Sequence, residues 1–594
     1  MRQLLSLMTA QERFKLPFVL LVMLSVAGVE VVGVAAIAGF VALVSDPAAM
    51  ASNRILAPLM EAVGPMEYRE FLPVAGIALF LVIAFRNVFG AFAVWVRLAF
   101  LHTMRKALAT RLLASYMAHP FSFFHSANSA TLTKNITYEV NQLITSYLYS
   151  WLVIIADLAM LAAILGMLFF NDPLVTLGTL GVLGGLAGGI LWLSRRRLLR
   201  LGQANRHYNE LLYKTTGEAI NGIKEIKVLG RESHFTEKFF GVSHRFARNS
   251  IIYQMFVEIP RFGLEILVVG GLLVIAFVMS RSDASTAEVT TTLTLFVAAF
   301  YRLMPSVHRL FSSFAGLQFN RAILDDLSES MLASTDERLR ADAETPDAMP
   351  FSDRMRLDDV RFRYGGAPSD TLNGISLTIP KNASIAFVGP TGVGKTTLVD
   401  MILGLLEPSS GRLTVDGTVI DRDNVRAWRR NVGYVPQMIY LADDTIRRNI
   451  ALGVAEDEIN DGQLRGAMQA AHLTDFVDSL PDGLDTIIGE RGIRLSGGQR
   501  QRIGIARALY GQASVLVLDE ATSSLDGITE AVIEDAIRDL HGRVTVITIA
   551  HRLTTVRHCD MVYMLKAGEI EASGAYADLL RDNDTFRQMA RATG

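Results

Sequence analysis

The sequence predicts an α-helical membrane domain of six spans, followed by a soluble α/β domain that carries a phosphate-binding loop. Three observations lead to this prediction. The mean hydropathy of +0.31 is too apolar for an ordinary soluble protein. Nearly all of the apolar excess lies before about residue 325, in runs long enough to cross a bilayer. After about residue 351, β-rich runs alternate with helical patterns, which is typical of an α/β domain.

Length, charge and cysteine content exclude several classes of protein. A chain of 594 residues exceeds the roughly 100–200 residues usual for one domain, so we expect two or more domains. The balance of 57 basic against 59 acidic residues lacks the basic excess of a nucleic-acid binder, so we expect no nucleic-acid partner. A single cysteine, Cys559, excludes a disulfide framework and a cysteine-rich metal site.

Six apolar runs are the candidate membrane-spanning helices. The first contains only one charged residue, Glu30, and exceeds the ~20 residues needed to span hydrocarbon, so we interpret it as a span and not as a cleaved signal peptide. Gly181, Gly185 and Gly189 recur every four residues in the fourth run, which predicts close packing against another helix. The six runs cover residues 16–44, 71–102, 146–170, 173–193, 251–280 and 287–304.

The distribution of basic residues predicts the orientation of the spans. The connections after spans two and four are rich in lysine and arginine, whereas those after spans one, three and five are poor in them. Because basic loops stay in the cytoplasm, both termini and the two basic connections are expected there. Residues 119–132 and 219–239, within these connections, are candidates for coupling the membrane domain to the soluble domain.

A polar stretch over residues 334–350 separates the two parts of the chain. Its composition, rich in Asp, Glu, Arg, Thr and Ser, is typical of a linker. We therefore expect a membrane domain over residues 1–333, a linker over 334–350 and the α/β domain over 351–594.

The clearest motif is a phosphate-binding loop that matches G-x-x-x-x-G-K-[ST] between an apolar strand and a helix. Its glycines let backbone N–H groups approach phosphate oxygens, and the helix amino terminus adds a positive dipole end. Lys395 is expected to contact the terminal phosphates, and the Thr396 hydroxyl is expected to ligate Mg²⁺. The expected nucleotide-contacting residues are Gly389, Pro390, Thr391, Gly392, Val393, Gly394, Lys395, Thr396 and Thr397.

A second apolar strand, over residues 515–518, ends in two acidic residues. A carboxylate at a buried strand tip is the usual partner of Mg²⁺ in such folds, so Asp519 is expected to bind the metal. The adjacent Glu520 is placed to orient or deprotonate an attacking water.

The segment Leu495-Ser496-Gly497-Gly498-Gln499 resembles the signature motif of the ATP-binding cassette family. The resemblance covers the whole chain in the family's one-chain, six-span exporter arrangement. Four further residues resemble family positions. They are Tyr364, which would stack on adenine, Gln437, which would sense Mg²⁺ and the membrane domain, Asp526, in the loop that contacts the partner domain, and His551, which would contact the γ-phosphate.

The resemblance implies ATP hydrolysis by two copies of the chain. In this family one domain supplies the side that binds the phosphates, here Lys395, Thr396, Asp519 and Glu520. The opposite domain supplies the signature residues, here Ser496 to Gln499, across a head-to-tail interface. Since each expected catalytic position of this sequence is intact, a homodimer with two competent sites is favoured over a heterodimer with a related chain. ATP and Mg²⁺ are the implied ligands.

Charged residues within the spans are the candidates for binding the cargo. Arginines in a membrane cavity would suit an anionic substrate, because guanidinium binds phosphate bidentately. The alternative is that these arginines only pair with carboxylates of the same domain, namely Glu30, Glu258 and Glu265. The candidate residues are Arg86, Arg261, Arg302 and Arg309.

The favoured cargo is a lipid-linked oligosaccharide of the polyprenyl pyrophosphate type. Residues 300–309 resemble the sixth span of the lipid-linked oligosaccharide flippases, a branch of these exporters, and residues 53–63 could form an external amphipathic helix like theirs. The first alternative is a general lipid or hydrophobic-drug exporter. The second is a membrane-anchored regulatory ATPase. The resemblance places the chain in a bacterial inner membrane, with the nucleotide-binding domain in the cytoplasm.

Overall fold

The computed structural model describes residues 5–45, 68–171, 173–281, 286–324, 327, 346–520, 527–550, 553 and 555–593. The chain divides into two compact units, one formed by Met1–His119 and Ser126–Arg340, the other by Pro120–His125 and Ala341–Gly594. Most of the expected linker over residues 334–350, and the expected external helix over 53–63, lie outside the described residues.

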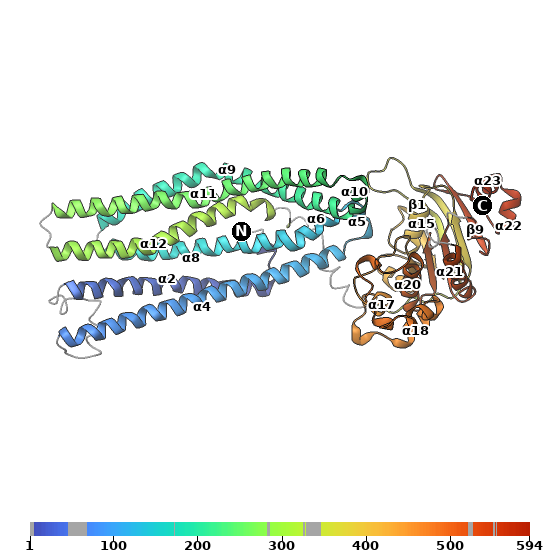
Figure 1. Ribbon diagram of the computed structural model, residues 1–594, viewed down its shortest axis with the longest axis horizontal. Coiled ribbons are helices and arrows are strands. Elements are labelled where there is room, and N and C mark those ends of the chain that lie inside the picture. The colour runs from blue at the N-terminus through green and yellow to red at the C-terminus, as the bar shows by residue number, and fades with distance from the viewer. Residues whose placement is uncertain are drawn as a thin grey trace. The chain divides into compact units, whose positions relative to one another are not determined.

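Among the described residues, long helices dominate the first unit (Figure 1). Each helix contains all or most of one of the six apolar runs, and several continue far beyond it. The fourth, fifth and sixth runs fall in α9, α11 and α12. Three described stretches, Ala10–Val41, Tyr68–Met117 and Ser129–Phe170, are long and apolar enough to cross a membrane. The helices are α2 (Ala10–Ser45), α4 (Tyr68–Met117), α8 (Tyr149–Asn171), α9 (Pro173–Asn221), α11 (Glu232–Ser280) and α12 (Thr286–Phe319).

Shorter helical segments precede or join these helices. One series leads without a break into α8 and contains two π-helical turns, η2 and η3, which are local widenings of a helix. The expected coupling regions contain α5 and α6 in one case and α10 in the other. The segments are α5 (Phe121–Ser126), α6 (Ser129–Lys134), η2 (Asn135–Glu139), α7 (Val140–Gln142), η3 (Leu143–Leu148) and α10 (Ile223–Leu229).

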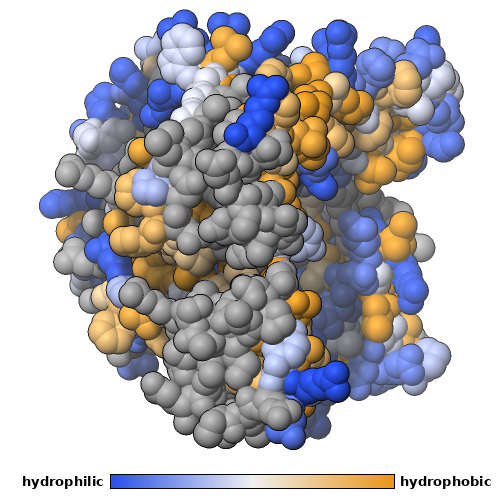
Figure 2. Space-filling model, turned by 90° about the vertical axis from the view of Figure 1, so that its left-hand side faces the viewer, coloured by the Kyte–Doolittle hydropathy of each residue, from blue (hydrophilic) through white to orange (hydrophobic). Residues whose placement is uncertain are grey.

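The interior of the helical unit is formed by α2, α8 and α12. Ala27, Ile164 and Leu303, one from each helix, belong to one buried apolar cluster. Large apolar side chains also lie on the outer faces of the helices, as Figure 2 shows at one end of the unit. An apolar exterior of this kind matches a hydrocarbon environment and not water.

The expected close packing of the glycines in α9 is not seen within this chain. No described atom lies within 4 Å of a Cβ placed on Gly181, Gly185 or Gly189. The reason is that the three glycines are on the outward face of α9, where they are exposed.

The second unit contains two sheets, which confirms the expected α/β class. The six-stranded sheet has the order β10-β9-β3-β8-β7-β6, in which β9, β3, β8, β7 and β6 are parallel and β10 is antiparallel to β9. The four-stranded sheet is antiparallel, in the order β2-β1-β4-β5. The strands are β1 (Arg354–Phe362), β2 (Leu372–Pro380), β3 (Ser384–Val388), β4 (Ser410–Val415), β5 (Thr418–Val419), β6 (Val432–Val435), β7 (Val515–Asp519), β8 (Thr545–Ile549), β9 (Met561–Lys566) and β10 (Glu569–Gly574).

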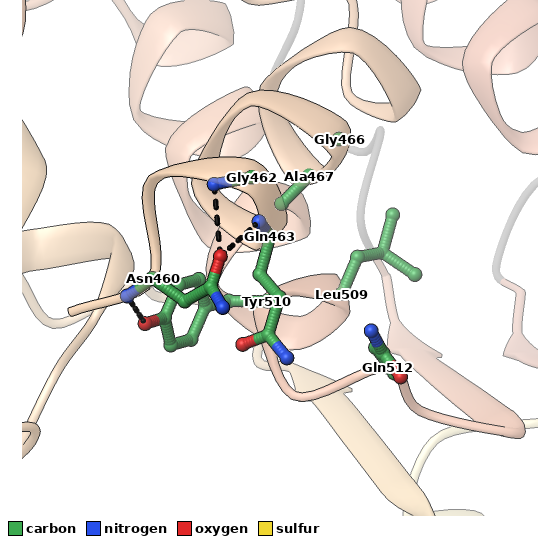
Figure 3. A pocket seen from close by; sticks show the side chains of 8 residues that line it. All are labelled: Asn460, Gly462, Gln463, Gly466, Ala467, Leu509, Tyr510 and Gln512. Carbon is green, nitrogen blue, oxygen red and sulfur yellow. Dashed lines mark hydrogen bonds between the residues drawn. The ribbon is translucent and has the colours of Figure 1, made fainter. Parts of the chain in front are cut away.

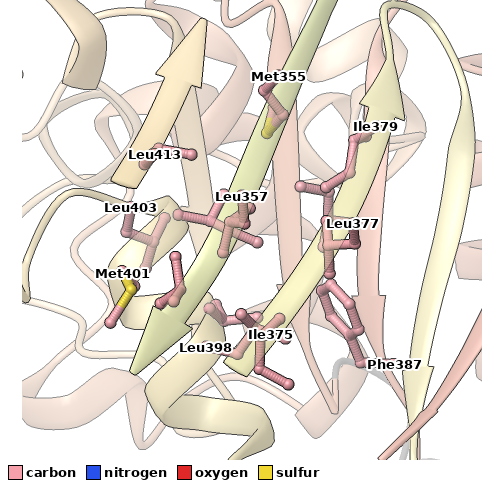
Figure 4. Packing of buried hydrophobic residues seen from close by; sticks show 14 of the residues in the cluster. Met355, Leu357, Ile375, Leu377, Ile379, Phe387, Leu398, Met401, Leu403 and Leu413 are labelled. Carbon is pink, nitrogen blue, oxygen red and sulfur yellow. The ribbon is translucent and has the colours of Figure 1, made fainter. Parts of the chain in front are cut away.

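Two apolar cores hold this unit together. The first joins the four-stranded sheet to β3 and to the helix that follows it, with Leu357, Phe387 and Leu398 fully buried (Figure 4). The second packs helices against β6, β7 and β8, with Leu464, Ile503 and Leu516 fully buried. The helices are α15 (Lys395–Ile402), α16 (Val425–Arg429), α17 (Ile446–Ile450), α18 (Asp461–Ala470), α19 (Thr474–Asp478), α20 (Gly497–Tyr510), α21 (Gly527–Asp539), α22 (Tyr576–Asp582) and α23 (Asp584–Thr593).

Candidate functional site

The phosphate loop connects β3 to α15, as the motif requires. Gly389 has φ of 146° and Gly394 has φ of 99°, backbone conformations that side chains disfavour. A Cβ on Gly389 would lie 2.4 Å from the Leu565 carbonyl oxygen, and one on Gly394 would lie 2.9 Å from that of Thr371. Glycine is therefore needed at both positions by conformation and by space.

Lys395, the first residue of α15, is buried within the loop that precedes it. Its Nζ donates hydrogen bonds to the carbonyl oxygens of Gly389 (2.7 Å) and Pro390 (3.0 Å). Burial lowers the pKa of Lys395, and the negative charges of Glu520 and Asp519 oppose this effect. The ammonium group is thus held within the loop, near enough to Asp519 and Glu520 for their negative charges to act on it.

The two threonines after Lys395 differ in environment. Thr396 is exposed, so its hydroxyl is free to meet a metal ion or a phosphate. Thr397 is buried, and its Oγ1 is 3.2 Å from the hydroxyl oxygen of Tyr364. That bond and an edge-on contact with Phe362 fix the half-buried ring of Tyr364 beside the start of α15.

The expected acidic pair lies at the same sheet edge as the phosphate loop. In the register of the parallel strands, Asp519 pairs with Ile549 and Ile549 pairs with Phe387, one residue before the end of β3. One strand, β8, therefore separates Asp519 from the strand that feeds the loop, a distance of roughly 10 Å for two strand spacings. Carboxyl ends of parallel strands are where ligands bind in such sheets.

Gln437 and Glu520, far apart in the sequence, are brought together by the fold. Gln437 Nε2 donates to Glu520 Oε2 at 2.6 Å. Glu520 has φ of 50°, an uncommon value for a residue with a side chain, and its N–H donates to the Ile549 carbonyl oxygen. Tyr434 donates to Asp519 Oδ2 at 3.4 Å, and burial raises the pKa of Tyr434.

One functional candidate, Asp400 in α15, escaped the sequence analysis. It is 5% exposed, and burial raises its pKa to about 6, with a further contribution from the negative charge of Asp519. A carboxylate inside the apolar run Leu398-Val399-Asp400-Met401-Ile402 is the sequence signal that could have found it. Asp400 lies one turn of α15 behind Thr396.

The raised pKa of Asp400 predicts a pH-dependent stability. Between pH ~4 and ~6 the folded unit binds the proton that the unfolded chain releases, so stability falls as pH rises through this window and stays lower above it. Asp400→Asn is expected to raise the free energy of unfolding by about 3 kcal/mol above pH 6 and by little below pH 4. Thermal unfolding of the full chain without nucleotide, compared with the exposed control Asp423→Asn, measures this. Equal shifts at both pH values would contradict it.

The signature segment opens α20. Ser496 is the N-cap residue, and its Oγ accepts a hydrogen bond from the N–H of Gln499 (3.2 Å), while the Ser496 N–H donates to Gln499 Oε1 (2.8 Å). This reciprocal pair stabilises the helix start, and Gly498 is buried beneath it. Among the described residues, no hydrogen bond joins Ser496–Gln499 to the phosphate loop of the same chain.

Three of the expected residues cannot be placed in full. Asp526 and His551 lie outside the described residues. Arg302 is in α12, but its side chain is outside the described part of the chain.

The other candidate cargo-binding arginines each have a carboxylate partner. Arg86 is 3.7 Å from Glu30, and Arg261 is 3.0 Å from Glu265, as the pairing alternative expected. Arg309 instead forms a two-pronged pair with Asp157, with Nε–Oδ2 at 2.9 Å and Nη2–Oδ1 at 2.6 Å. The Asp157 partner was missed because residues 152 apart give no spacing signal. These pairs balance much of the positive charge that an anion site requires.

A separate shallow cavity of about 440 Å³ lies between the start of α18 and the end of α20 (Figure 3). Asn460 caps α18 there, and its N–H donates to the Tyr510 hydroxyl oxygen. No lysine, arginine or acidic residue lines it, so it lacks the charge to bind a triphosphate. The lining residues are Asn460, Gly462, Gln463, Gly466, Ala467, Leu509, Tyr510 and Gln512.

A phosphate loop facing a carboxylate pair across one strand, in a chain with long apolar helices, defines a membrane-bound P-loop ATPase. Family models agree in both units: that of the ABC transporter matches residues 372–523, and that of the ABC transporter transmembrane region matches residues 35–304. The chain belongs to the ABC transporter family. It is therefore a multi-pass protein of the bacterial inner membrane with a cytoplasmic ATPase domain, and it couples ATP hydrolysis to transport.

Curated relatives are similar over most of the chain, and all three cited here are named ATP-dependent lipid A-core flippase. The protein of Ralstonia nicotianae is 32% identical over 82% of this chain and 81% of its own length. That of Thiobacillus denitrificans is 30% identical over 88% and 89%, and that of Burkholderia pseudomallei is 29% identical over 93% and 92%. A solved bacterial Atm1-family ABC exporter with ATP bound has a TM-score of 0.74 at 23% identity, covering 96% of this chain and 98% of that one, and so shares the fold.

Proposed function

We propose that two copies of this chain form an ATP-driven flippase that moves an anionic glycolipid from one leaflet of the inner membrane to the other. The observation that carries the proposal is the similarity, over most of the chain, to relatives named for lipid A-core flipping. The intact phosphate loop and acidic pair support an active ATPase rather than a regulatory one.

The site residues divide the work of phosphoryl transfer. The loop N–H groups and Lys395 would hold and neutralise the phosphates, and Glu520 would take a proton from the attacking water while its bond from Gln437 orients it. Thr396, Asp519 and Gln437 offer the oxygen donors that Mg²⁺ prefers, and when bound this ion would neutralise phosphate charge.

A second copy is needed to complete the site. Since the signature residues Ser496 to Gln499 make no described bond to their own phosphate loop, we expect them to contact a nucleotide held by the partner copy. Apolar side chains on the described surface also suit protein contacts. Val228 and Leu229 are exposed on α10, in an expected coupling region, and Met438 and Ile493 are exposed in the second unit.

The cargo proposal rests on shared chemistry. A lipid-linked oligosaccharide of the polyprenyl pyrophosphate type and a lipid A-core glycolipid both combine acyl or prenyl chains with phosphate and sugar. The resemblance of residues 300–309 to the lipid-linked oligosaccharide flippases favours the polyprenyl pyrophosphate cargo. The relatives named lipid A-core flippase favour the lipid A-core glycolipid. A general lipid or hydrophobic-drug exporter stays the alternative, because Arg86, Arg261 and Arg309 are paired and leave less charge for an anion.

Flipping in proteoliposomes tests the proposal. Fluorescent versions of a lipid A-type phosphoglycolipid, a polyprenyl pyrophosphate saccharide and an uncharged lipid are placed in separate vesicles, and ATP-dependent change of leaflet is followed with a membrane-impermeant quencher. We expect one anionic glycolipid to move and the uncharged lipid to stay. Movement of the uncharged lipid alone would favour the general exporter. The Glu520→Gln chain is the matched inactive control.

A further inference from the structure

We propose that His125 is a positioning residue of the nucleotide site: its imidazole packs against Tyr364 and holds that ring where it stacks on adenine. The inference rests on the proposed function, because it requires ATP at the phosphate loop and the expected contact of Tyr364 with the base. It does not depend on which cargo is moved.

The segment that carries His125 belongs to the second compact unit, although it lies between two membrane spans in the sequence. Pro120–His125 group with Ala341–Gly594, whereas α4 before this segment and α6 after it belong to the first unit. His125 is exposed near the end of the short helix α5 (Phe121–Ser126). An exposed side chain of this kind is not needed to fill the apolar core of the unit.

His125 contacts two aromatic rings. Its ring centroid is 4.9 Å from that of Phe121, one turn earlier on α5, and the two planes are perpendicular. It is 5.6 Å from the ring centroid of Tyr364, with the planes inclined at 43°. Both distances fall in the range of roughly 4.5–7 Å over which aromatic rings attract each other. Phe121 therefore helps to orient the imidazole, and the imidazole in turn restrains Tyr364.

Three described contacts restrain the ring of Tyr364, and His125 supplies one of them. Phe362 meets the ring edge-on, with the centroids 4.9 Å apart. The hydroxyl oxygen of Tyr364 is 3.2 Å from Thr397 Oγ1 on α15. Phe362 and Thr397 come from the ATPase fold itself, whereas His125 comes from a separate segment of the chain. Without His125 the ring would keep two contacts and lose one restraint on its orientation.

The charge of His125 also acts on the helix that follows the phosphate loop. Thr397 and Asp400 are three residues apart and so share one face of α15. Tyr364 contacts Thr397 through its hydroxyl group. Burial raises the pKa of Asp400 to about 6, and the positive charge that His125 can carry opposes this rise. Tyr364 and His125 thus both lie near this face of α15, directly behind the phosphate loop.

Steady-state hydrolysis by the full-length chain in nanodiscs tests the proposal. His125→Ala removes the ring, and we expect the KM for ATP to rise about two- to tenfold, the range that an aromatic pair contributes, while kcat stays within about twofold. His125→Phe keeps an aromatic ring and should restore the KM. Inorganic tripolyphosphate, which has no base, should compete with ATP equally well in all three proteins.

A second histidine provides a matched control. His244 is exposed on α11 in the first unit, and its ring stacks on that of Phe240, four residues earlier, with centroids 6.1 Å apart. His244→Ala therefore removes a similar contact elsewhere and should leave the KM unchanged. An unchanged KM in His125→Ala, a matching loss of tripolyphosphate affinity, or a fall in kcat alone overturns the proposal. So does a His125→Phe chain that behaves like His125→Ala.

Tyr364→Ala distinguishes a failure of this inference from a failure of the function on which it rests. It should raise the KM for ATP, and adding His125→Ala should raise the KM no further, because the imidazole acts through Tyr364. Additive losses overturn the proposal, and so does an unchanged KM in Tyr364→Ala, which would show that this ring does not contact adenine. If the unaltered chain hydrolyses ATP but moves no lipid, the proposed flippase function fails and the KM results still decide the role of His125.

Discussion

Replacing Glu520 with Gln is expected to stop steady-state ATP hydrolysis while leaving ATP binding intact. A positioned general base contributes about 10²–10⁴ in rate, so turnover should fall by a factor in that range. Binding should persist because the phosphate contacts come from the loop at residues 389–396, on the other side of β8. An amide can still bond with Gln437, so the local structure around the 2.6 Å contact should change little.

The measurement is phosphate release together with retained nucleotide, on the full chain in nanodiscs. Glu458→Gln is the matched control, because Glu458 is exposed and lies in a 3-10 turn (Glu456–Glu458) on the surface of the second unit. We expect the Glu520→Gln chain to hold ATP and the control to hydrolyse it normally. Undiminished phosphate release from Glu520→Gln would assign the base to another residue.

The sequence alone could predict the parts of the site that depend on local spacing. The loop from Gly389 to Lys395 is continuous, so its motif specifies both its residues and its strand–helix context. The Gln437–Glu520 contact joins residues that follow two different strands, β6 and β7, and only the pairing of these strands brings their ends together. Asp400 is a different case, because the apolar residues on both sides of it signal its burial in the sequence, whereas the effect of Asp519 on it depends on the fold.

In the membrane unit, too, some features could be predicted from local sequence and others depend on the fold. The length of the apolar runs predicted where the long helices are, because a segment that crosses the hydrocarbon must satisfy its backbone polar groups internally, as a helix does. It did not predict which helix faces meet. The glycines of α9 were expected to pack against another helix and instead face outward, and Arg309, for which no particular partner was predicted, pairs with Asp157. Such pairings depend on how each helix is rotated about its axis relative to its neighbours, and the amino-acid composition of a helix does not determine this rotation.

The Arg309–Asp157 pair allows a structural role to be separated from a role in cargo binding. Asp157 has a side chain that is 6% exposed, whereas that of Arg309 is 43% exposed. Arg309→Met leaves a buried carboxylate without its partner, and we expect this to cost about 2–3 kcal/mol of stability. Adding Asp157→Leu removes the unpaired group, so the double variant should recover most of the loss, because a buried ion pair adds little beyond an apolar pair of similar volume.

Thermal inactivation of the single and double variants measures the coupling between the two residues, and the flipping assay run on the same samples measures the function. If Arg309 only holds α12 against α8, stability and flipping should both return in the double variant. If Arg309 also contacts an anionic cargo, stability should return while flipping stays lost, because no guanidinium is left to bind phosphate. Arg261→Met/Glu265→Leu is the control pair, since both side chains are about half exposed and their ion pair should contribute little. If the double variant is as unstable as Arg309→Met, an apolar pair cannot replace the ion pair. That result would contradict our explanation that the unpaired Asp157 carboxylate causes the loss of stability.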